Sequence, residues 1–323
     1  MIIFEGYSME FKRIGKSGLQ LSTITYGSAL TIGTETDDVN IAQSMIDKAW
    51  ELGIRSFDTS NNYGYGKAET LLGLALKKYP REQFVVATKG SWPIGESIYH
   101  QGLSRKHIVW AIEQSLARLQ LDYVDIYYAH RYDPLTPMEE VVRTFNQLIE
   151  RGKILYWATS EWPLKALVEC HEVCESLGME KPVLEQFIYS YAIDKSDFSG
   201  VKDFCIRNNV GMLGFSPLAQ GLLTGKYEHG IPQTSRIAKS SKIGYDKTSK
   251  IYEQTKEKVD YFCKICRANN IKESHAAIQW VLRNGVYPVL GASTPEQLVE
   301  NVDALNANFP ETFWHELDEL KKK

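Results

Sequence analysis

Short apolar runs alternate along this chain with longer segments in which apolar residues recur every three or four positions. The short runs are rich in Val, Ile, Tyr and Phe, which is typical of strands that are buried on both faces. We therefore predict eight strands, at residues 23–27, 54–58, 84–89, 123–128, 154–158, 183–186, 210–214 and 287–290.

The longer segments have the period of amphipathic helices. In segment 39–52, for example, Ile41 and Met45 fall on one helical face together with the apolar residues that follow them. Ser104 and Thr136 precede two of the other segments and are predicted N-caps. The remaining predicted helices cover residues 68–78, 104–119, 137–150, 163–177, 275–283 and 295–305.

Strands that alternate with helices pair in parallel through right-handed crossovers, and about eight such units favour a closed (β/α)8 barrel, the TIM-barrel architecture. Segments 11–14 and 19–22 flank two glycines and predict an N-terminal β-hairpin before the barrel. Extra helices and loops are also expected, because segment 216–249 is long and rich in Gly, Ser, Lys and Pro. We predict an α/β fold with one barrel domain over residues 1–323.

An open, doubly wound sheet is the alternative fold. Its dinucleotide-binding form needs G-x-G-x-x-G directly after an early strand. The nearest pattern, Gly64-Tyr65-Gly66, lacks the third glycine. The barrel is therefore favoured.

Composition and charge narrow the classes of partner. The chain has 323 residues, of which 43% are hydrophobic, and a formal net charge of −3. Because the chain has no overall positive charge, nucleic acid and anionic membranes are disfavoured as partners. No apolar run approaches the roughly 20 residues of a membrane-spanning helix, and the N-terminus lacks the pattern of a secretory signal. Because five cysteines form no dense framework, we expect a cytoplasmic protein that does not insert into membranes.

Two cysteine pairs raise the alternative of a zinc site. Cys170 and Cys174 are four residues apart, and Cys263 and Cys266 are three apart. Such spacing places each pair on one face of a helix. We interpret all four as packing residues and expect no bound metal.

Polar residues end three consecutive predicted strands. The second predicted strand ends in Asp58, and Tyr63 lies five residues after Asp58. The third predicted strand ends in Lys89, and His130 comes shortly after the fourth. In a barrel the carboxyl ends of all strands meet at one rim, where catalytic groups gather. We therefore expect Asp58, Tyr63, Lys89 and His130 to lie close together.

This set of residues suits the reduction of a carbonyl, which needs a hydride on carbon and a proton on oxygen. A free tyrosine has a pKa of about 10, too high for an efficient donor at neutral pH. We expect Lys89 to lower the pKa of Tyr63, Asp58 to keep Lys89 charged, and His130 to orient the carbonyl. Each residue also has an ordinary alternative interpretation: in the order Asp58, Tyr63, Lys89 and His130, these are a cap, a loop aromatic, a solvated lysine and a structural histidine. Their joint placement favours a site.

The same residues carry a resemblance to a known family. Segment 57–64, followed by Lys67-Ala68-Glu69, resembles the Asp–Tyr signature of the aldo-keto reductase superfamily. Segments 87–89 and 129–130 resemble its Lys and His sites, and 121–125 resembles its entry to the fourth strand. The second half of the chain most resembles one branch of this superfamily, the branch that contains the voltage-gated potassium channel beta subunits. The matching segments are residues 156–160, 215–219, 225–227 and 291–293.

The resemblance implies NADPH or NADP+ as the cofactor, bound extended across the rim without a glycine-rich phosphate loop. It assigns Ser160 and Gln186 to the nicotinamide amide, Phe215 to the ring, Ser216, Leu218 and Gln220 to the pyrophosphate, Lys226 and Arg236 to phosphates, and Ser293, Gln297 and Asn301 to the adenosine end. Independently, a Lys and an Arg in a Gly/Ser-rich loop suit a 2′-phosphate, which favours NADPH over NADH. Solvated loop charges and exposed helix residues are the ordinary alternatives.

Two positions depart from the pattern of the resembled family. Glu161 stands where relatives often carry Asn or Arg, and a carboxylate pointing inward there would repel phosphates. We expect Glu161 to point away or to bond a ribose. Phe215 replaces a Trp or Tyr, but a phenyl ring can still stack on the nicotinamide.

These patterns predict an NADPH-dependent oxidoreductase that reduces small aldehydes or ketones to alcohols. The first alternative is a regulatory subunit that binds NADPH and docks on a membrane channel, as the resembled branch implies. A second alternative is an isomerase or aldolase that uses Lys89 to form a Schiff base. The channel-subunit resemblance leaves a homo-oligomer, a tetramer or octamer, open.

Overall fold

Eight strands close into a barrel in this computed structural model, which describes residues 2–4, 7–194, 199–227 and 247–319. The strands are parallel and are surrounded by helices, so the predicted (β/α)8 TIM barrel is confirmed. Their order around the barrel is β5 (Thr25–Gly27), β6 (Ser56–Asp58), β7 (Val85–Gly90), β8 (Val124–Ala129), β9 (Ile154–Ser160), β10 (Leu184–Ile188), β11 (Gly211–Phe215) and β12 (Tyr287–Leu290). Each overlaps a predicted strand.

The strand register aligns the carboxyl ends of β6, β7 and β8. Asp58 pairs with Ala87 across β6 and β7, and Lys89 pairs with Tyr128 across β7 and β8. Since all three strands run in the same direction, the residues that follow each strand emerge on one rim.

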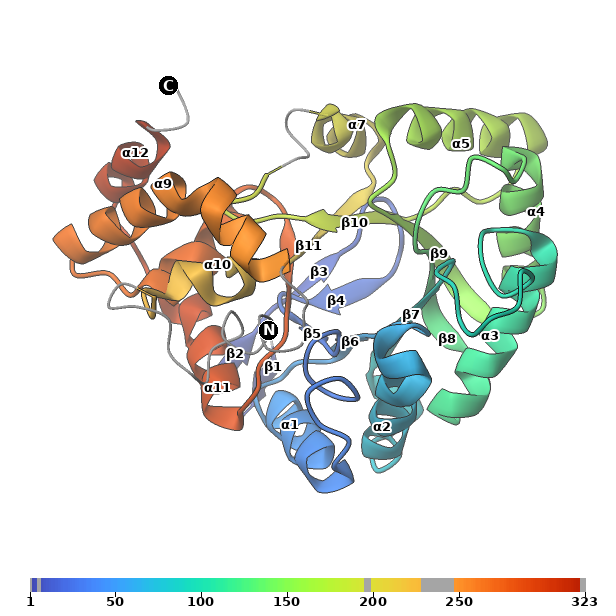
Figure 1. Cartoon of the computed structure of the whole chain (residues 1–323), viewed down its shortest axis with the longest axis horizontal. Coiled ribbons are helices and arrows are strands. Elements are labelled where there is room, and N and C mark those ends of the chain that lie inside the picture. Colours follow the sequence, from blue (N-terminus) through green and yellow to red (C-terminus); the bar gives the residue numbers. More distant parts are fainter. Residues whose placement is uncertain (1, 5–6, 195–198, 228–246, 320–323) are drawn as a thin grey trace. The chain divides into compact units, whose positions relative to one another are not determined.

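Helices cover the outside of the strands (Figure 1). Those that match predicted segments are α1 (Val39–Glu51), α2 (Lys67–Leu76), α3 (Arg105–Leu119), α4 (Met138–Glu150), α5 (Leu164–Leu177), α10 (Glu273–Arg283) and α11 (Pro295–Asp303). Elements without a predicted counterpart are β1 (Ile2–Phe4), β2 (Tyr7–Met9), α7 (Val201–Asn208), α9 (Lys247–Ala268) and α12 (Glu311–Asp318). The apolar side chains Val259, Phe262, Cys263 and Cys266 of α9 are buried at helical spacing, a signal present in the sequence.

One predicted helix cap is correct and one is wrong. The Ser104 side chain accepts a hydrogen bond from the backbone N–H of His107 and caps α3. At α4 the N-cap is Pro137, whereas the Thr136 hydroxyl donates to Oδ2 of Asp133, 2.7 Å away. Thr136 therefore orders the preceding loop, because a nearby carboxylate competes for its hydroxyl.

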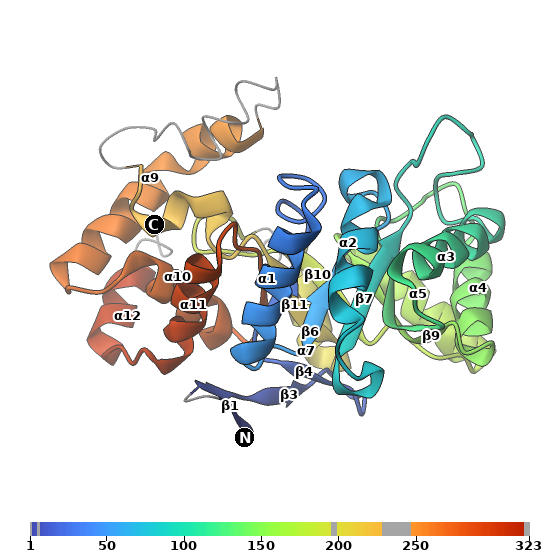
Figure 2. The same cartoon turned by 90° about the horizontal axis from the view of Figure 1, so that it is seen from below.

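The predicted N-terminal hairpin is present and covers the amino ends of barrel strands. It consists of β3 (Phe11–Arg13) and β4 (Gln20–Ser22), paired antiparallel, and Figure 2 shows it beneath the strands. Gly15 lies in the turn with a φ of 54°, and a Cβ there would collide with the backbone oxygen of Asn209. Only glycine tolerates both conditions. The hairpin leaves the opposite, carboxyl-end rim to other groups.

Aromatic side chains fill the layer between β8, β9 and α4. The Phe145 ring lies 5.0 Å from Trp157 and 5.5 Å from Tyr127, centroid to centroid, and all three are fully buried. The Trp157 indole N–H donates to the backbone oxygen of Glu180, 2.9 Å away. Burial of each such ring stabilises the fold by roughly 1.5–3 kcal/mol, so this layer anchors α4 on the strands.

The chain divides into two compact units. Unit 1 contains Met1–Phe187, Ser196–Leu213 and Val289–Val299, and unit 2 contains Ile188–Lys195, Gly214–Pro288 and Glu300–Lys323. Within unit 2, Tyr189 stacks on Trp280 with centroids 5.1 Å apart. The single domain over residues 1–323 stays a prediction. Within the described residues, no helix has the length and apolarity needed to cross a bilayer.

Candidate active site

The four predicted catalytic residues come from neighbouring strands of unit 1. Asp58 is the last residue of β6, Lys89 lies near the end of β7, and His130 directly follows β8. Tyr63 begins the short 3-10 helix η1 (Tyr63–Gly66) after β6. Contacts among these side chains bring all four together.

Asp58 and Lys89 form a buried ion pair. Their side chains are 3% and 0% exposed, and Nζ of Lys89 donates to Oδ1 of Asp58. Nζ also donates to the backbone oxygen of Thr59 at 2.9 Å. The second carboxylate oxygen, Oδ2, accepts a hydrogen bond of 2.9 Å from Nε2 of Gln186. A buried charge pair is tolerated only with such additional hydrogen bonds.

Tyr63 lies beside this ion pair. Nζ of Lys89 is 5.2 Å from the ring centroid of Tyr63 and 5.2 Å from that of Tyr128. Burial raises the pKa of Tyr63, while the charge of Lys89 and its hydrogen bond lower the pKa; burial is the larger effect, and the pKa lies above its ordinary value. Lys89 thus acts in the predicted direction, but the predicted net fall of the pKa is wrong. The reason is that desolvation opposes the charged phenolate.

His130 is a buried, neutral imidazole between two aromatic edges. The rings of Tyr63 and Trp92 lie 6.1 and 6.3 Å from it, both nearly perpendicular. Burial, together with the positive charges of Lys89 and Arg131, holds the pKa of His130 well below its usual range. The ring is therefore uncharged at neutral pH and has one N–H donor.

Three further residues contact this cluster and were not predicted from the sequence. Ser60 Oγ lies 3.1 Å from Nδ1 of His130. Tyr128 accepts a hydrogen bond from Gln186 at 3.3 Å. Arg131 donates from Nη1 to the backbone oxygen of His130 at 2.6 Å and to Oγ of Ser160 at 3.2 Å. Only their positions in the sequence could have indicated these three residues. Ser60 and Arg131 are within two residues of predicted site residues, and Tyr128 falls in a predicted strand.

Four residues assigned to the cofactor lie in unit 1. Ser160, at the end of β9, is 1% exposed and accepts from Arg131, while Gln186 in β10 is 3% exposed. Ser293 and Gln297 are exposed. Ser293 donates from Oγ to Glu35 at 3.0 Å, and its N–H donates to Oε1 of Gln297 at 2.9 Å. Ser160 and Gln186 are thus held by hydrogen bonds with Arg131 and Asp58, whereas Ser293 and Gln297 form a separate pair.

The other assigned residues belong to unit 2. Phe215 ends β11, Ser216 and Leu218 follow it, Gln220 lies in η3 (Ala219–Thr224), and Asn301 is buried in α11. Ser216 and Gln220 have φ angles of 58° and 59°, an uncommon backbone conformation that marks a specialised loop. Lys226 is exposed, with Nζ 5.1 Å from the Tyr227 ring centroid. Arg236 lies outside the described residues.

Glu161, the departure noted above, occupies a left-handed backbone position with a φ of 55°. Its N–H donates to the backbone oxygen of Gln186 at 2.9 Å, which joins the end of β9 to β10. The backbone of this residue therefore has a structural role beside the two residues assigned to the nicotinamide.

The aromatic residues that follow the strand ends differ in exposure. Trp92 is 41% exposed and stands edge-on to His130, so it can contact a ligand. Trp162 is 2% exposed and donates from Nε1 to the backbone oxygen of Ala129 at 3.0 Å, which makes it part of the scaffold. The Tyr132 ring packs against Trp162 with centroids 5.5 Å apart.

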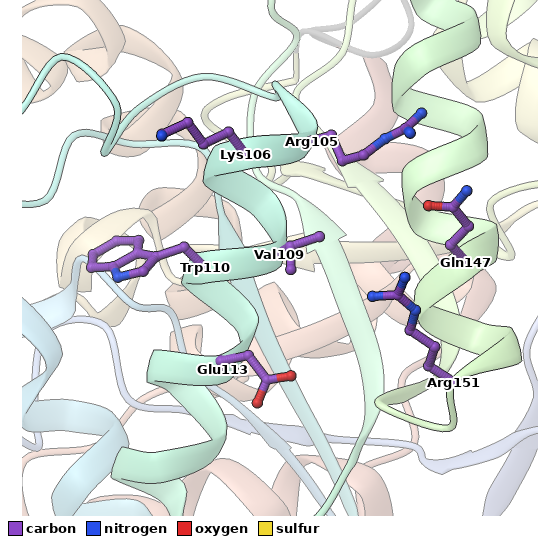
Figure 3. Close-up of a pocket in the computed structure, with 7 residues that line it drawn as sticks. All are labelled: Arg105, Lys106, Val109, Trp110, Glu113, Gln147 and Arg151. Atoms are coloured by element: carbon purple, nitrogen blue, oxygen red, sulfur yellow. The ribbon is translucent and has the colours of Figure 1, made fainter.

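A separate surface hollow of about 600 Å³ lies between α3 and α4 (Figure 3). Arg105, Lys106, Trp110 and Arg151 are among the seven residues that line it, and no predicted site residue is. All five cysteines are free and buried. Within the described part of the chain, no group of three or more His, Cys, Asp or Glu side chains could hold a metal ion.

Comparison with known proteins agrees with the resemblance seen in the sequence. The family model "Aldo/keto reductase family" matches residues 23–322. A Schizosaccharomyces pombe protein named "Putative voltage-gated potassium channel subunit beta" is 39% identical over 312 residues, which cover 94% of this chain and 90% of that protein.

Proposed function

Because the chain belongs to the aldo/keto reductase family, we propose that it reduces aldehydes or ketones to alcohols with NADPH. Membership of the family supports oxidoreduction of carbonyls in general. The observation that carries the finer proposal is the buried Asp58–Lys89 ion pair beside Tyr63 and a neutral His130. These four groups can bind a carbonyl oxygen and protonate it.

Tyr63 is the proposed proton donor. The phenol is protonated at neutral pH, and the charge of Lys89, which lowers the pKa of Tyr63 against the larger effect of burial, favours release of the proton when a carbonyl oxygen gains negative charge. Lys89 then stabilises the phenolate that remains, and Asp58 holds Lys89 in place. Solvent returns the proton to Tyr63 after the alcohol leaves.

His130 is the proposed orienting group. As a neutral ring it can donate one hydrogen bond to a carbonyl oxygen without adding a positive charge beside Lys89. Its edge-on packing against Tyr63 and Trp92 limits rotation of the ring. A carbonyl oxygen that meets both His130 and Tyr63 is held for protonation.

NADPH is the proposed cofactor, and when bound it supplies the hydride. The residues present fit its nicotinamide carboxamide: Ser160 is buried and keeps its own hydroxyl proton, since Arg131 donates to it. Gln186 uses its amide nitrogen on Asp58, so its oxygen is left to accept from the carboxamide. The roles of Phe215, Ser216, Leu218, Gln220, Ser293, Gln297 and Asn301 stay predictions.

Preference for NADPH over NADH rests on Lys226 and Arg236. Two cations near a 2′-phosphate would add charge-assisted hydrogen bonds that NADH cannot make. We expect Arg236→Ala to weaken the binding of NADPH more than that of NADH. Equal weakening of both would remove Arg236 from the 2′-phosphate.

A channel-regulating subunit is the second candidate, because the Schizosaccharomyces pombe relative carries that name at 39% identity. The presence of a complete set of Asp58, Tyr63, Lys89 and His130 favours catalysis. A steady-state assay of NADPH oxidation with aromatic and small aliphatic aldehydes distinguishes the two. Tight NADPH binding without turnover on that panel would favour the regulatory subunit and reject the reductase.

A Schiff-base enzyme is less well supported. The amine of Lys89 is engaged by Asp58 and the backbone of Thr59, and a charged ammonium is not nucleophilic. Trapping of a substrate on Lys89 by borohydride would contradict this view. The remaining expectations, a cytoplasmic location and a homo-oligomer, stay predictions.

A further inference from the structure

Ser60 lies among three groups that compete for its single hydroxyl proton. Its Oγ is 2.6 Å from Oδ1 of Asn62, 3.1 Å from Nδ1 of His130 and 3.4 Å from the backbone oxygen of Lys89. Ser60 is fully buried, so these neighbours decide where the proton points. A hydroxyl donates once and accepts at two lone pairs.

The direction of that proton determines which nitrogen of a neutral His130 is protonated. If Ser60 donates to Asn62, then Nδ1 of His130 must donate to Ser60, and Nε2 has no proton. If Ser60 donates to Nδ1 instead, the ring proton is on Nε2. Among the described residues, Nε2 has no hydrogen-bond partner, so it is the nitrogen available to a ligand.

Asn62 permits both arrangements because its side-chain amide carries an acceptor and a donor. With Oδ1 toward Ser60, Asn62 takes the serine proton. A half-turn of the amide presents Nδ2, which donates to Ser60 and leaves the serine proton for His130. Asn62 is partly exposed, and within the described chain its side chain has only this one hydrogen bond.

We propose that Ser60 is a positioning residue that donates its hydroxyl proton to Nδ1 of His130, so that the ring presents Nε2–H to the substrate carbonyl. The inference rests on the proposed reductase function, since a carbonyl oxygen can accept a hydrogen bond but cannot donate one. Ser60 touches neither substrate nor cofactor in this role. It acts through the tautomer of His130, as partners of reactive histidines do in other enzymes.

Nitrogen NMR of the full-length protein with isotope-labelled histidine reads the tautomer directly. The signals of His130 are identified by their loss in His130→Gln, and the spectrum is recorded in excess NADP+. We expect Nε2 to be the protonated nitrogen and Nδ1 the unprotonated one. A spectrum in which Nδ1 carries the proton would overturn the proposal, whether or not the protein turns over a carbonyl.

Ser60→Ala tests the consequence of losing the donor. We expect a mixture of both tautomers and a fall in kcat of about tenfold, the scale of one hydrogen bond, with the KM for NADPH changed less than about twofold. The matched control is Ser56→Ala, which removes a buried hydroxyl from the strand that precedes Ser60 and whose partner is Ser22. The control should retain the parent tautomer and kcat.

The outcomes for Ser60 and for the reductase are separable. An unchanged tautomer and an unchanged kcat in Ser60→Ala would reject the positioning role, because a merely structural hydroxyl would affect stability alone. A protein with protonated Nε2 that oxidises no NADPH on the aldehyde panel would instead reject the reductase and leave the assignment of the Ser60 proton intact.

Discussion

Gln186 donates a hydrogen bond from its side-chain amide to the carboxylate of Asp58, 2.9 Å away, although 128 residues separate the two in sequence. This bond joins β10 to β6 through the barrel interior, and Lys89 occupies the other oxygen of the same carboxylate. Asp58 is therefore held from two sides, and it in turn fixes the ammonium beside Tyr63. Stability and the proposed catalysis depend on one buried cluster.

Removal of the Lys89 charge should destabilise the fold strongly. We expect Lys89→Met to lower the free energy of unfolding by about 3–5 kcal/mol, because it leaves the buried Asp58 carboxylate unpaired. Denaturant unfolding measures the change. The double variant Asp58→Asn/Lys89→Met should recover much of the loss, since neither charge remains; a double variant as unstable as the sum of the single variants would show that the pair is not coupled.

Gln186→Leu should remove, at nearly constant volume, the hydrogen bond to the charged Asp58 carboxylate and the longer one to the hydroxyl of Tyr128. The expected loss of unfolding free energy is about 1.5–3 kcal/mol. We also expect a lower kcat, because a loosened Asp58 no longer fixes Lys89. A variant with parent stability in denaturant unfolding would mean that the bond between Gln186 and Asp58 contributes nothing in solution.

The pH dependence of reduction should reflect the raised pKa of Tyr63. A pKa above the ordinary value means that the phenol is still protonated where a free tyrosine, at about 10, begins to ionise. We therefore expect no alkaline fall of kcat/KM due to Tyr63 below about pH 10. A loss of activity near neutral pH that disappears in Lys89→Met would instead indicate a lowered pKa.

Buried histidines should make the protein acid-sensitive. Burial lowers the pKa of His107 and His171 to about 4 each. Between about pH 6.5 and pH 4 the unfolded chain binds protons that the folded chain does not, so stability falls with falling pH by up to about 1.4 kcal/mol per unit for each histidine.

Glu185 opposes this trend, because burial raises its pKa to about 8, so its contribution falls as pH rises from about 4.5 to 8. His130, whose pKa is also held well below its usual range, acts in the same direction as His107 and His171, so the histidines together outweigh one carboxyl group between about pH 4.5 and 6.5. Thermal unfolding of His107→Phe/His171→Phe should therefore show a much weaker acid dependence than the parent. An identical acid dependence would assign the effect to other groups.

The sequence predicted the barrel and the four clustered residues for a simple physical reason. Parallel strands share one direction, so polar residues that end consecutive strands meet on one rim, and Asp58, Lys89 and His130 could be placed from strand positions alone. The sign of the Tyr63 pKa shift could not be predicted, because desolvation depends on how deeply the loop after β6 packs.

Competition between side chains for one hydroxyl proton also could not be predicted from the sequence. Thr136 precedes α4 as a cap would, but Asp133 takes its hydroxyl. Ser60 and Asn62 read as ordinary loop residues, and their meaning depends on a backbone that brings His130 to 3.1 Å from a hydroxyl seventy residues earlier. Local spacing does not encode such contacts across strands.

The proposal that Tyr63 donates the proton is tested most directly by a single-turnover measurement of NADPH oxidation with an aromatic aldehyde. The rate of the unmodified protein is compared with that of Tyr63→Phe. NADPH affinity is measured in parallel by cofactor fluorescence. We expect the variant to bind NADPH as the parent does and to lose about 10²–10⁴-fold in rate. A variant that binds NADPH and reduces the aldehyde at the parent rate would show that another group supplies the proton.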